Sequence, residues 1–235
     1  MAVGRLTWGA AADRKYETGL KQGVLYPVNA AGAYTPGVAW NGLTGVTESP
    51  EGAEATDLYA DDGKYLTMRS AENLKGTIEC YTYPDEFAVL NGEMSLINNQ
   101  DGVFAGQQSR GIFGLCYRTV IGNAVSGDNY GYKLHCVYGC QVSPSEKAYS
   151  PINDSPEAVT FSFEFSTTPV PIGTTGKQTA SITIDSTKFS GTAAKAKLTA
   201  LEDKLYGTNA SGGQEGTEAY LPLPAEIITT LTPDA

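Results

Sequence analysis

The residues best suited to chemistry are a single histidine, His135, and four cysteines, Cys80, Cys116, Cys136 and Cys140. These side chain types serve as general bases, nucleophiles and zinc ligands. His135 stands inside a strand pattern, and each cysteine stands among Tyr, Leu and Val, where a thiol packs as a small apolar group. Cys136 and Cys140, about 13 Å apart on one strand face, are too distant for a disulfide. We predict buried free thiols, a structural histidine and no zinc site.

Three short motifs offer weaker chemical alternatives. The acids of residues 57–63 do not alternate as in a calcium loop, and the glutamate at the twelfth position of such a loop is missing. Residues 173–177 contain Gly-Lys without the spacing of a phosphate-binding loop. Asp85 and Glu86 could act as paired carboxylates in a hydrolase, but adjacent acids at a helix start more often complement the helix dipole. We therefore predict no catalytic, cofactor-binding or metal-binding residues, and no enzyme activity.

Alternating strand patterns dominate the chain. Residues 158–168 read AVTFSFEFSTT, so that Phe161, Phe163 and Phe165 face one way and Glu164 faces the other with Thr and Ser. Further strands are predicted at residues 38–47, 64–68, 77–82, 114–121, 132–142 and 178–184. The strands at 114–121 and 132–142 flank a turn-rich segment and are expected to be antiparallel neighbours.

Helices are fewer than strands in this sequence. Leucines three and four residues apart predict a helix over residues 192–206, capped by Thr192 and ended by Gly207, which should cover one face of a sheet. Short helices are expected after Pro84 and from Pro224. Between the first strands, residues 48–63 form an acidic segment that we interpret as a long inter-strand loop.

Length and charge limit the function classes. The chain has 235 residues, enough for one all-β domain, and we expect residues 1–235 to form a single domain. Its formal net charge of −10 argues against binding nucleic acid through phosphates, which needs clustered Lys and Arg. No apolar run approaches the roughly 18 residues of a membrane span, and residues 1–17 lack the apolar core of a signal peptide. We expect a protein made in the cytoplasm and no membrane partner.

Several separated blocks of the chain carry a family resemblance. They read GVAWNGLTGVTESPEGAEATDLYADDGKYL, GTIECYTYPDEFA, GQQSRGIFGLCYRTVIGN and SPSEKAYSPINDSPEAVTFSFEFSTTPV, followed by ITIDSTK, LEDKLYGT and LPLPAEII. In this order, from about residue 16 to residue 231, they resemble the major tail protein, or tail tube protein, of long-tailed, non-contractile bacteriophages of the siphovirus type.

The resemblance implies a β-sandwich or split-barrel tail-tube fold with a flanking helix. It implies hexameric rings, stacked into a tube, in which strands of neighbouring subunits join in a large closed inner β-barrel. Double-stranded DNA would pass through the lumen without specific binding. The other partners implied are the tape measure protein, the tail terminator and the distal tail proteins, and the location is the virion tail after assembly in the host cytoplasm. Residues 208–235 form only a C-terminal tail, and no extra immunoglobulin-like domain is expected.

Two sets of residues are hypothesised to act in such a tube. Glu79 and Glu164, on the polar faces of predicted strands, are candidates for the lumen, where repulsion of phosphates would prevent DNA from sticking. The segment 48–63 is the candidate contact between rings, with Leu58 and Tyr59 as apolar anchors. Its candidate contact residues are Glu48, Glu51, Glu54, Leu58, Tyr59, Asp61 and Asp62. The N-terminal arm, residues 1–15, and the C-terminal tail are assigned no contact from the sequence.

Physical arguments support this interpretation, and one alternative stays open. Barrels of about 16 to 18 strands already enclose water, so six subunits with four strands each would admit duplex DNA. Closing the sheet between subunits would also remove exposed edges. The alternative is a carbohydrate-binding or adhesive β-sandwich module in which Trp8 and Trp40 serve as sugar platforms.

Overall fold

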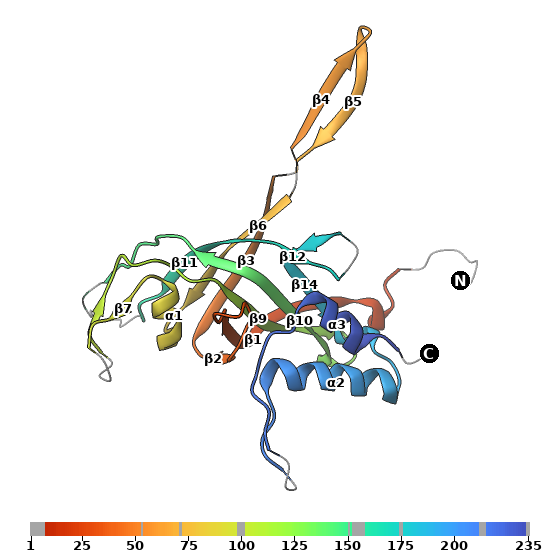
Figure 1. Ribbon diagram of the computed structural model, residues 1–235. Helices are drawn as coiled ribbons and strands as arrows, with labels where there is room; N and C mark the ends of the chain where they lie inside the picture. The colour runs from red at the N-terminus through yellow and green to blue at the C-terminus, as the bar shows by residue number, and fades with distance from the viewer. Residues whose placement is uncertain are drawn as a thin grey trace.

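An antiparallel sheet of eight strands forms the body of the protein (Figure 1). The computed structural model describes residues 8–52, 54–70, 72–97, 102–149, 151, 158–173, 176–211 and 215–233. The sheet order is β2-β1-β9-β10-β11-β6-β3, and β14 pairs with a different part of β10. Its strands are β1 (Lys15–Pro27), β2 (Val38–Trp40), β3 (Leu43–Gly52), β6 (Glu72–Cys80), β9 (Phe113–Asn123), β10 (Gly127–Val142), β11 (Phe161–Thr167) and β14 (Ser181–Asp185).

Short strand pairs and helices surround this sheet. The pairs are β4 (Ala55–Ala60) with β5 (Gly63–Arg69), β7 (Met94–Ser95) with β8 (Phe104–Ala105), and β12 (Val170–Pro171) with β13 (Gln178–Thr179). The helices are α1 (Asp85–Leu90), α2 (Thr192–Tyr206) and α3 (Pro224–Leu231), with the 3-10 turns η1 (Ala11–Asp13) and η2 (Ser186–Lys188). The mostly β architecture with flanking helices confirms the predicted fold class at that level.

The sheet is buried on both faces over its central strands. The inner core, on one face, includes Leu25, Trp40, Ile78, Phe87, Phe113, Leu115, Tyr117, Val137, Phe163 and Phe165. The outer core, on the other face, includes Tyr26, Cys116, Leu134, Cys136, Tyr138, Ile184, Leu198, Leu201, Leu205, Leu221 and Ile227. Successive residues of β9 therefore enter different cores, as the alternation of a strand requires. Because side chains from the edge strands β2 and β3 reach the inner core as well, the sheet curls around it.

Helix α2 covers the outer core through Leu198, Leu201 and Leu205, which are all buried as predicted. The predicted cap was wrong: Gly191 occupies the N-cap position, Thr192 is the first helical residue, and no side chain caps this end. The helix ends before Gly207, as expected. The hydroxyl of Tyr26 donates to the carbonyl of Leu205 at 2.6 Å, which ties the end of α2 to β1.

The two short helices confirm the predictions made from proline. Helix α1 follows Pro84, and its Phe87 packs against Trp40 and Phe163, with ring centroids 4.5 and 5.0 Å apart. Helix α3 begins at Pro224 and packs beside α2, where Lys204 Nζ lies 2.9 Å from Glu226 Oε1. Within the described residues, no helix is both long and apolar enough to span a membrane.

The predicted loop at residues 48–63 was wrong. Strand β3 continues to Gly52, and β4 with β5 forms a hairpin that stands away from the body (Figure 1). Its two-residue turn, Asp61 and Asp62, has φ values of 51° and 57°, which aspartate tolerates and which suit a tight hairpin. Acidic residues are depleted in strands, so the composition concealed this pairing. Ala53 lies outside the described residues, as do residues 1–7 of the predicted N-terminal arm and residues 212–214 and 234–235 of the predicted tail.

Strand β10 changes partner at Gly139. Residues 133–137 pair with β14, residues 140–142 pair with β11, and the register shifts between Val137 and Cys140. Gly139 has a φ of 60°, and a Cβ there would lie only 2.1 Å from the carbonyl oxygen of Thr168. The position therefore requires both the left-handed conformation and the small size of glycine.

We expect Gly139→Ala to destabilise the protein by at least about 3 kcal/mol, because left-handed strain and a backbone clash add together. Gly127→Ala is the matched control, since Gly127 has a φ of 56° but a Cβ added there would meet no atom within 4 Å. It should cost about 1 kcal/mol, the strain alone. Urea unfolding of both variants measures the difference, and equal losses would contradict this account of the bulge.

Candidate functional site: assembly surfaces

An exposed polar face covers β3, β6 and β11 on the side away from the inner core. Alternation in β11 buries Phe163 and Phe165, as predicted, and leaves Glu164 exposed. The register places Ser162 opposite Glu79 and Glu164 opposite Thr77, so both predicted lumen residues share this face. We call it the polar sheet face, and it consists of Thr47, Ser49, Glu51, Lys75, Thr77, Glu79, Ser162, Glu164 and Ser166.

The polar sheet face has an acidic balance. It carries the carboxylates of Glu51, Glu79 and Glu164 and a single ammonium group, that of Lys75. Lys75 Nζ lies 2.5 Å from Glu51 Oε2, and both side chains are more than half exposed, so the pair contributes little to stability. Glu79 and Glu164 extend into solvent beside uncharged Thr and Ser neighbours. The face would therefore repel a polyanion.

The β4–β5 hairpin, residues 55–69, forms a projecting arm with two different faces. Cross-strand pairing puts Leu58 opposite Leu66, with Met68 next to them on the same face, and these three are 41%, 40% and 57% exposed. On the other face, Asp57 Oδ1 lies 2.7 Å from Lys64 Nζ and accepts a hydrogen bond from Thr67. The bonds from Lys64 and Thr67 lower the pKa of Asp57. The apolar face therefore lies in solvent, backed by a polar face that is satisfied within the arm.

The structure separates the residues predicted to form the contact between rings. Leu58, Tyr59, Asp61 and Asp62 belong to the β4–β5 arm, with Tyr59 72% exposed, and Glu54 precedes it. Glu51 belongs to the polar sheet face. Glu48 lies apart from the arm, because its carboxylate accepts a hydrogen bond from the Tyr117 hydroxyl of the body at 2.7 Å.

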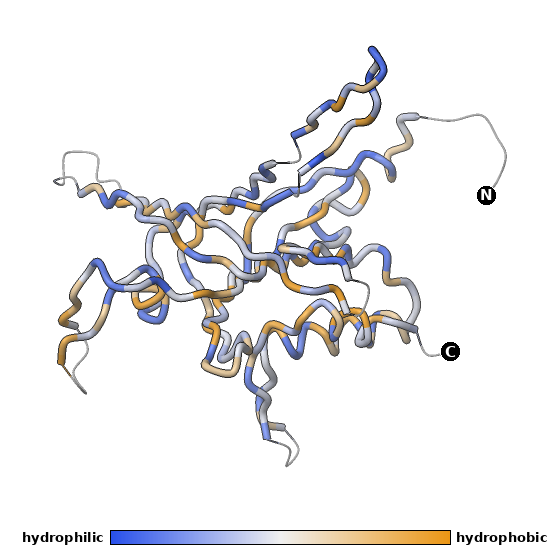
Figure 2. The backbone as a smooth tube through the Cα atoms, turned by 45° about the horizontal axis from the view of Figure 1, so that its top comes forward, coloured by the Kyte–Doolittle hydropathy of each residue, from blue (hydrophilic) through white to orange (hydrophobic). Residues whose placement is uncertain are grey.

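A second arm, missed in the sequence, surrounds the β7–β8 pair. Its described apolar residues larger than alanine are all 40–57% exposed: Met94, Leu96, Ile97, Val103 and Phe104. Figure 2 shows hydrophobic stretches along both projecting arms. A signal existed in the sequence, because the apolar runs MSLI and VFA flank the turn-forming residues NNQDG.

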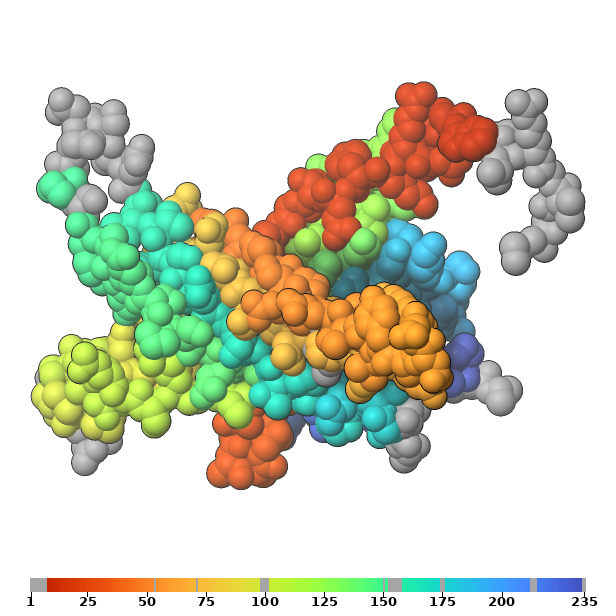
Figure 3. Space-filling model, turned by 90° about the horizontal axis from the view of Figure 1, so that it is seen from above, coloured from red at the N-terminus to blue at the C-terminus, as the bar shows by residue number. Residues whose placement is uncertain are grey.

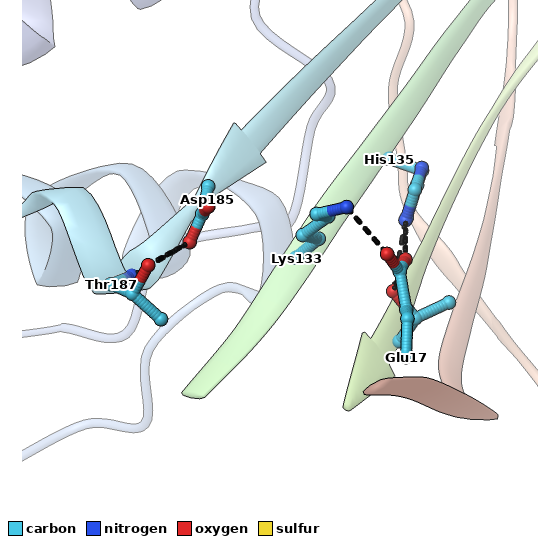
Figure 4. A network of polar contacts seen from close by, with 6 residues as sticks. Glu17, Lys133, His135, Asp185 and Thr187 are labelled. Atoms are coloured by element: carbon cyan, nitrogen blue, oxygen red, sulfur yellow. Dashed lines mark hydrogen bonds and ion pairs between the residues drawn. The ribbon is translucent and has the colours of Figure 1, made fainter. Parts of the chain in front are cut away.

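The single histidine belongs to a polar network on β1, β9 and β10 (Figure 4). Lys133 Nζ contacts the Glu17 carboxylate, and the Thr119 hydroxyl donates to the same carboxylate at 2.6 Å. His135 Nε2 lies 3.0 Å from that hydroxyl oxygen. Because the one hydroxyl proton goes to Glu17, Nε2 must donate, which assigns the Nε2-protonated tautomer.

Burial and neighbouring charges set the pKa values in this network. Burial lowers the pKa of His135, although the carboxylates of Glu48 and Glu17 oppose that shift. Burial acts to raise the pKa of Glu17, but hydrogen bonds from Lys133 and Thr119 outweigh it, so this pKa is lowered. The His135 ring stacks on Tyr117 with centroids 4.7 Å apart. The network thus ties three strands together around a neutral histidine.

The cysteines pack in the cores, as predicted. The common strand face predicted for Cys136 and Cys140 was wrong, because the bulge at Gly139 turns Cys140 into the inner core while Cys136 lies in the outer core. All four are buried and free, and burial raises the pKa of Cys80 to about 11. The register makes Cys116 and Cys136 cross-strand partners, with their Sγ atoms 3.9 Å apart, a pairing that the sequence did not reveal. Among the described residues, no group of three His, Cys, Asp or Glu side chains could hold a metal ion.

No protein-family model matches this chain, and no curated protein sequence matches it.

We expect acid to destabilise the protein through His135. Its folded-state pKa is below the ordinary value, so the unfolded chain binds the proton more readily as the pH falls below about 6.5. Stability should therefore fall between that pH and the folded-state pKa, by up to about 1.4 kcal/mol per pH unit. His135→Phe, which keeps a ring against Tyr117, should lack this component. Urea unfolding from pH 8 to pH 5 tests it, and identical pH profiles would contradict the assignment.

Proposed function

We propose that this protein is a subunit of a bacteriophage tail tube, which assembles into stacked hexameric rings around a conduit for double-stranded DNA. The observation that carries the proposal is the polar sheet face. It is a broad exposed β-surface that contains Glu79 and Glu164, and the opposite face of the same strands is fully packed. An acidic wall of this kind would let DNA slide, because it offers few cations to displace the counterions of the phosphates.

The adjacent strands β11, β6 and β3, together with residues 140–142 at the end of β10, are the proposed contribution of each subunit to the lumen wall. Six such sets would give a barrel of about 24 strands, well above the number at which barrels enclose water. Strand β3 is an edge of the sheet. Pairing this edge with a neighbouring subunit would remove an exposed row of backbone donors and acceptors.

The β4–β5 arm is the proposed contact between rings. An isolated two-stranded hairpin is marginally stable in water, and an exposed apolar face of this kind marks an interaction site. Leu58, Leu66 and Met68 would be buried on a subunit of the next ring. Asp57 and Lys64 neutralise each other on the other face of the arm.

The structure removes one of the two sugar platforms expected for the carbohydrate-binding alternative, because Trp40 is buried. Trp40 is only 3% exposed, packs on Phe87 and donates its indole N–H to the carbonyl of Thr82 at 3.0 Å. It is therefore a core residue and cannot stack on a sugar. Trp8 is 82% exposed, but among the described residues no second tryptophan accompanies it at the surface.

Negative-stain electron microscopy of the purified chain over a concentration series tests the proposed function directly. We expect rings or hollow tubes whose pore admits duplex DNA. A glycan array should be silent. Solid aggregates, or discrete particles without a pore, would contradict the tube.

We expect the double variant Glu79→Lys and Glu164→Lys to assemble into tubes that bind double-stranded DNA, whereas wild-type tubes do not. The new cations would release counterions, so binding should weaken steeply with salt. Asp203→Lys, on the exposed side of α2, is the control for a cation introduced outside the polar sheet face, and it should leave the tubes inert to DNA. If the double variant binds DNA no better than this control, neither Glu79 nor Glu164 lines the lumen.

We expect the triple variant Leu58→Ser, Leu66→Ser and Met68→Ser to fold normally but to form no tubes. All three side chains are substantially exposed, so the free energy of unfolding of the monomer should change by about 0.5 kcal/mol or less per substitution. The control pair Asp57→Asn and Lys64→Gln alters only the other face of the arm. Circular dichroism and electron microscopy provide the measurements, and tubes of normal length from the triple variant would contradict the contact.

A further inference from the structure

A tube of stacked rings needs two separate contacts, one between rings and one within each ring. The proposed function gives the β4–β5 arm to the first and the edge of β3 to part of the second. The second arm leaves the body in a different direction, as Figure 1 shows for β7. The surface chemistry of this second arm indicates what it contacts.

The β7–β8 arm, defined as residues 94–97 and 102–106, has the composition of an interface core. These residues include no charged side chain. Met94, Leu96, Ile97, Val103 and Phe104 are all substantially exposed, Leu96 most of all at 57%. The centres of protein interfaces are depleted in charge and enriched in Met and aromatic residues. The arm thus presents apolar side chains that the described part of its own subunit covers only in part.

An apolar groove lies beside β14 and α3. Its apolar lining consists of Ile182, Ile184, Phe189, Ile227, Ile228 and Leu231. Four consecutive residues, 182–185, contribute to it, so it runs along the edge of β14 and not over one face. Among the described strands β14 pairs with β10 alone, which leaves that edge open. The Asp185 carboxylate at its end already accepts two hydrogen bonds from Thr187.

The arm and the groove lie at opposite ends of the molecule. In Figure 3 the yellow-green arm is at the left edge and the dark blue C-terminal segment is at the right edge. One subunit therefore cannot place its own arm in its own groove. A second copy can, because each chain carries both a projecting apolar surface and an apolar hollow.

We infer that the β7–β8 arm of one subunit docks in the β14–α3 groove of the next copy, as a lateral contact within a ring in addition to the proposed pairing of the β3 edge. This inference rests on the proposed function. The two surfaces differ and face opposite ways, so the contact is heterologous and repeats from subunit to subunit until a ring closes. Burial of the arm also covers the open edge of β14, which otherwise invites indiscriminate strand pairing.

The test uses two variants that each disable one side of the contact, Leu96→Glu on the arm and Ile228→Glu on the groove. These side chains are 57% and 50% exposed, so folding should be preserved. Val125→Glu is the matched control, because Val125 is 67% exposed in the turn between β9 and β10, away from both surfaces. Every protein also carries the triple substitution of the β4–β5 arm, which suppresses association between rings.

Sedimentation velocity should show that each disabled variant associates at least about tenfold more weakly than the control. A mixture of the two should form a complex of two chains that grows no further, since the Leu96→Glu chain keeps a groove and the Ile228→Glu chain keeps an arm. Association of either variant equal to the control overturns the inference, as does a mixture that stays monomeric.

Microscopy separates this inference from the proposed function. If both disabled variants still form hollow rings, the proposed tube function is supported and the docking inference is overturned. Two-chain complexes in the mixture, together with wild-type particles that have no pore, would keep the docking and overturn the tube. A wild-type chain that stays monomeric over the whole concentration series overturns the docking outright.

Discussion

The antiparallel pairing of β9 with β10 is the constraint on which the rest of the structure depends. The central residues of both strands are buried on both faces, so each of them must suit either the inner or the outer core. Leu115 and Val137 enter the first, whereas Cys116 and Cys136 enter the second beneath α2. Because both cores share one backbone, any slip of register would exchange their side chains. The β-bulges between these strands, with Gly139 at one of them, therefore take up the local shifts of register.

The pairing of β9 with β10 also determines how the outer strands β11 and β6 are aligned. Once β10 aligns β11 through residues 140–142, and β11 aligns β6, the alternation of each strand puts its aromatic residues inside and its polar residues outside. Glu79 and Glu164 reach one exposed face in this way, although they are far apart in the chain. The acidic surface on which the proposed function rests is thus a consequence of core packing.

The reactive side chains serve the structure. Burial raises the pKa of the Cys80 and Cys140 thiols, which disfavours the thiolate, and His135 is held neutral between strands. The unusual features lie at the surface instead, in an acidic sheet face and two apolar arms. Assembly would bury the apolar arms and pair the open edges, two liabilities that an isolated subunit would carry in solution.

The sequence by itself determined those features that depend on local periodicity. These are the strand patterns of β9 and β11, the buried leucines of α2, the proline starts of α1 and α3, and the burial of the thiols. The alternation expected along β10 breaks at Gly139, so that Cys140 and Val142 enter the inner core and not the outer one. Only the tertiary structure decided which strands are neighbours, that Cys116 faces Cys136, that Glu48 bonds Tyr117, and that residues 55–60 form a strand. A periodic pattern records which side of a strand is apolar. It does not record the partner, because pairing depends on closing long loops and on the register that two cores impose.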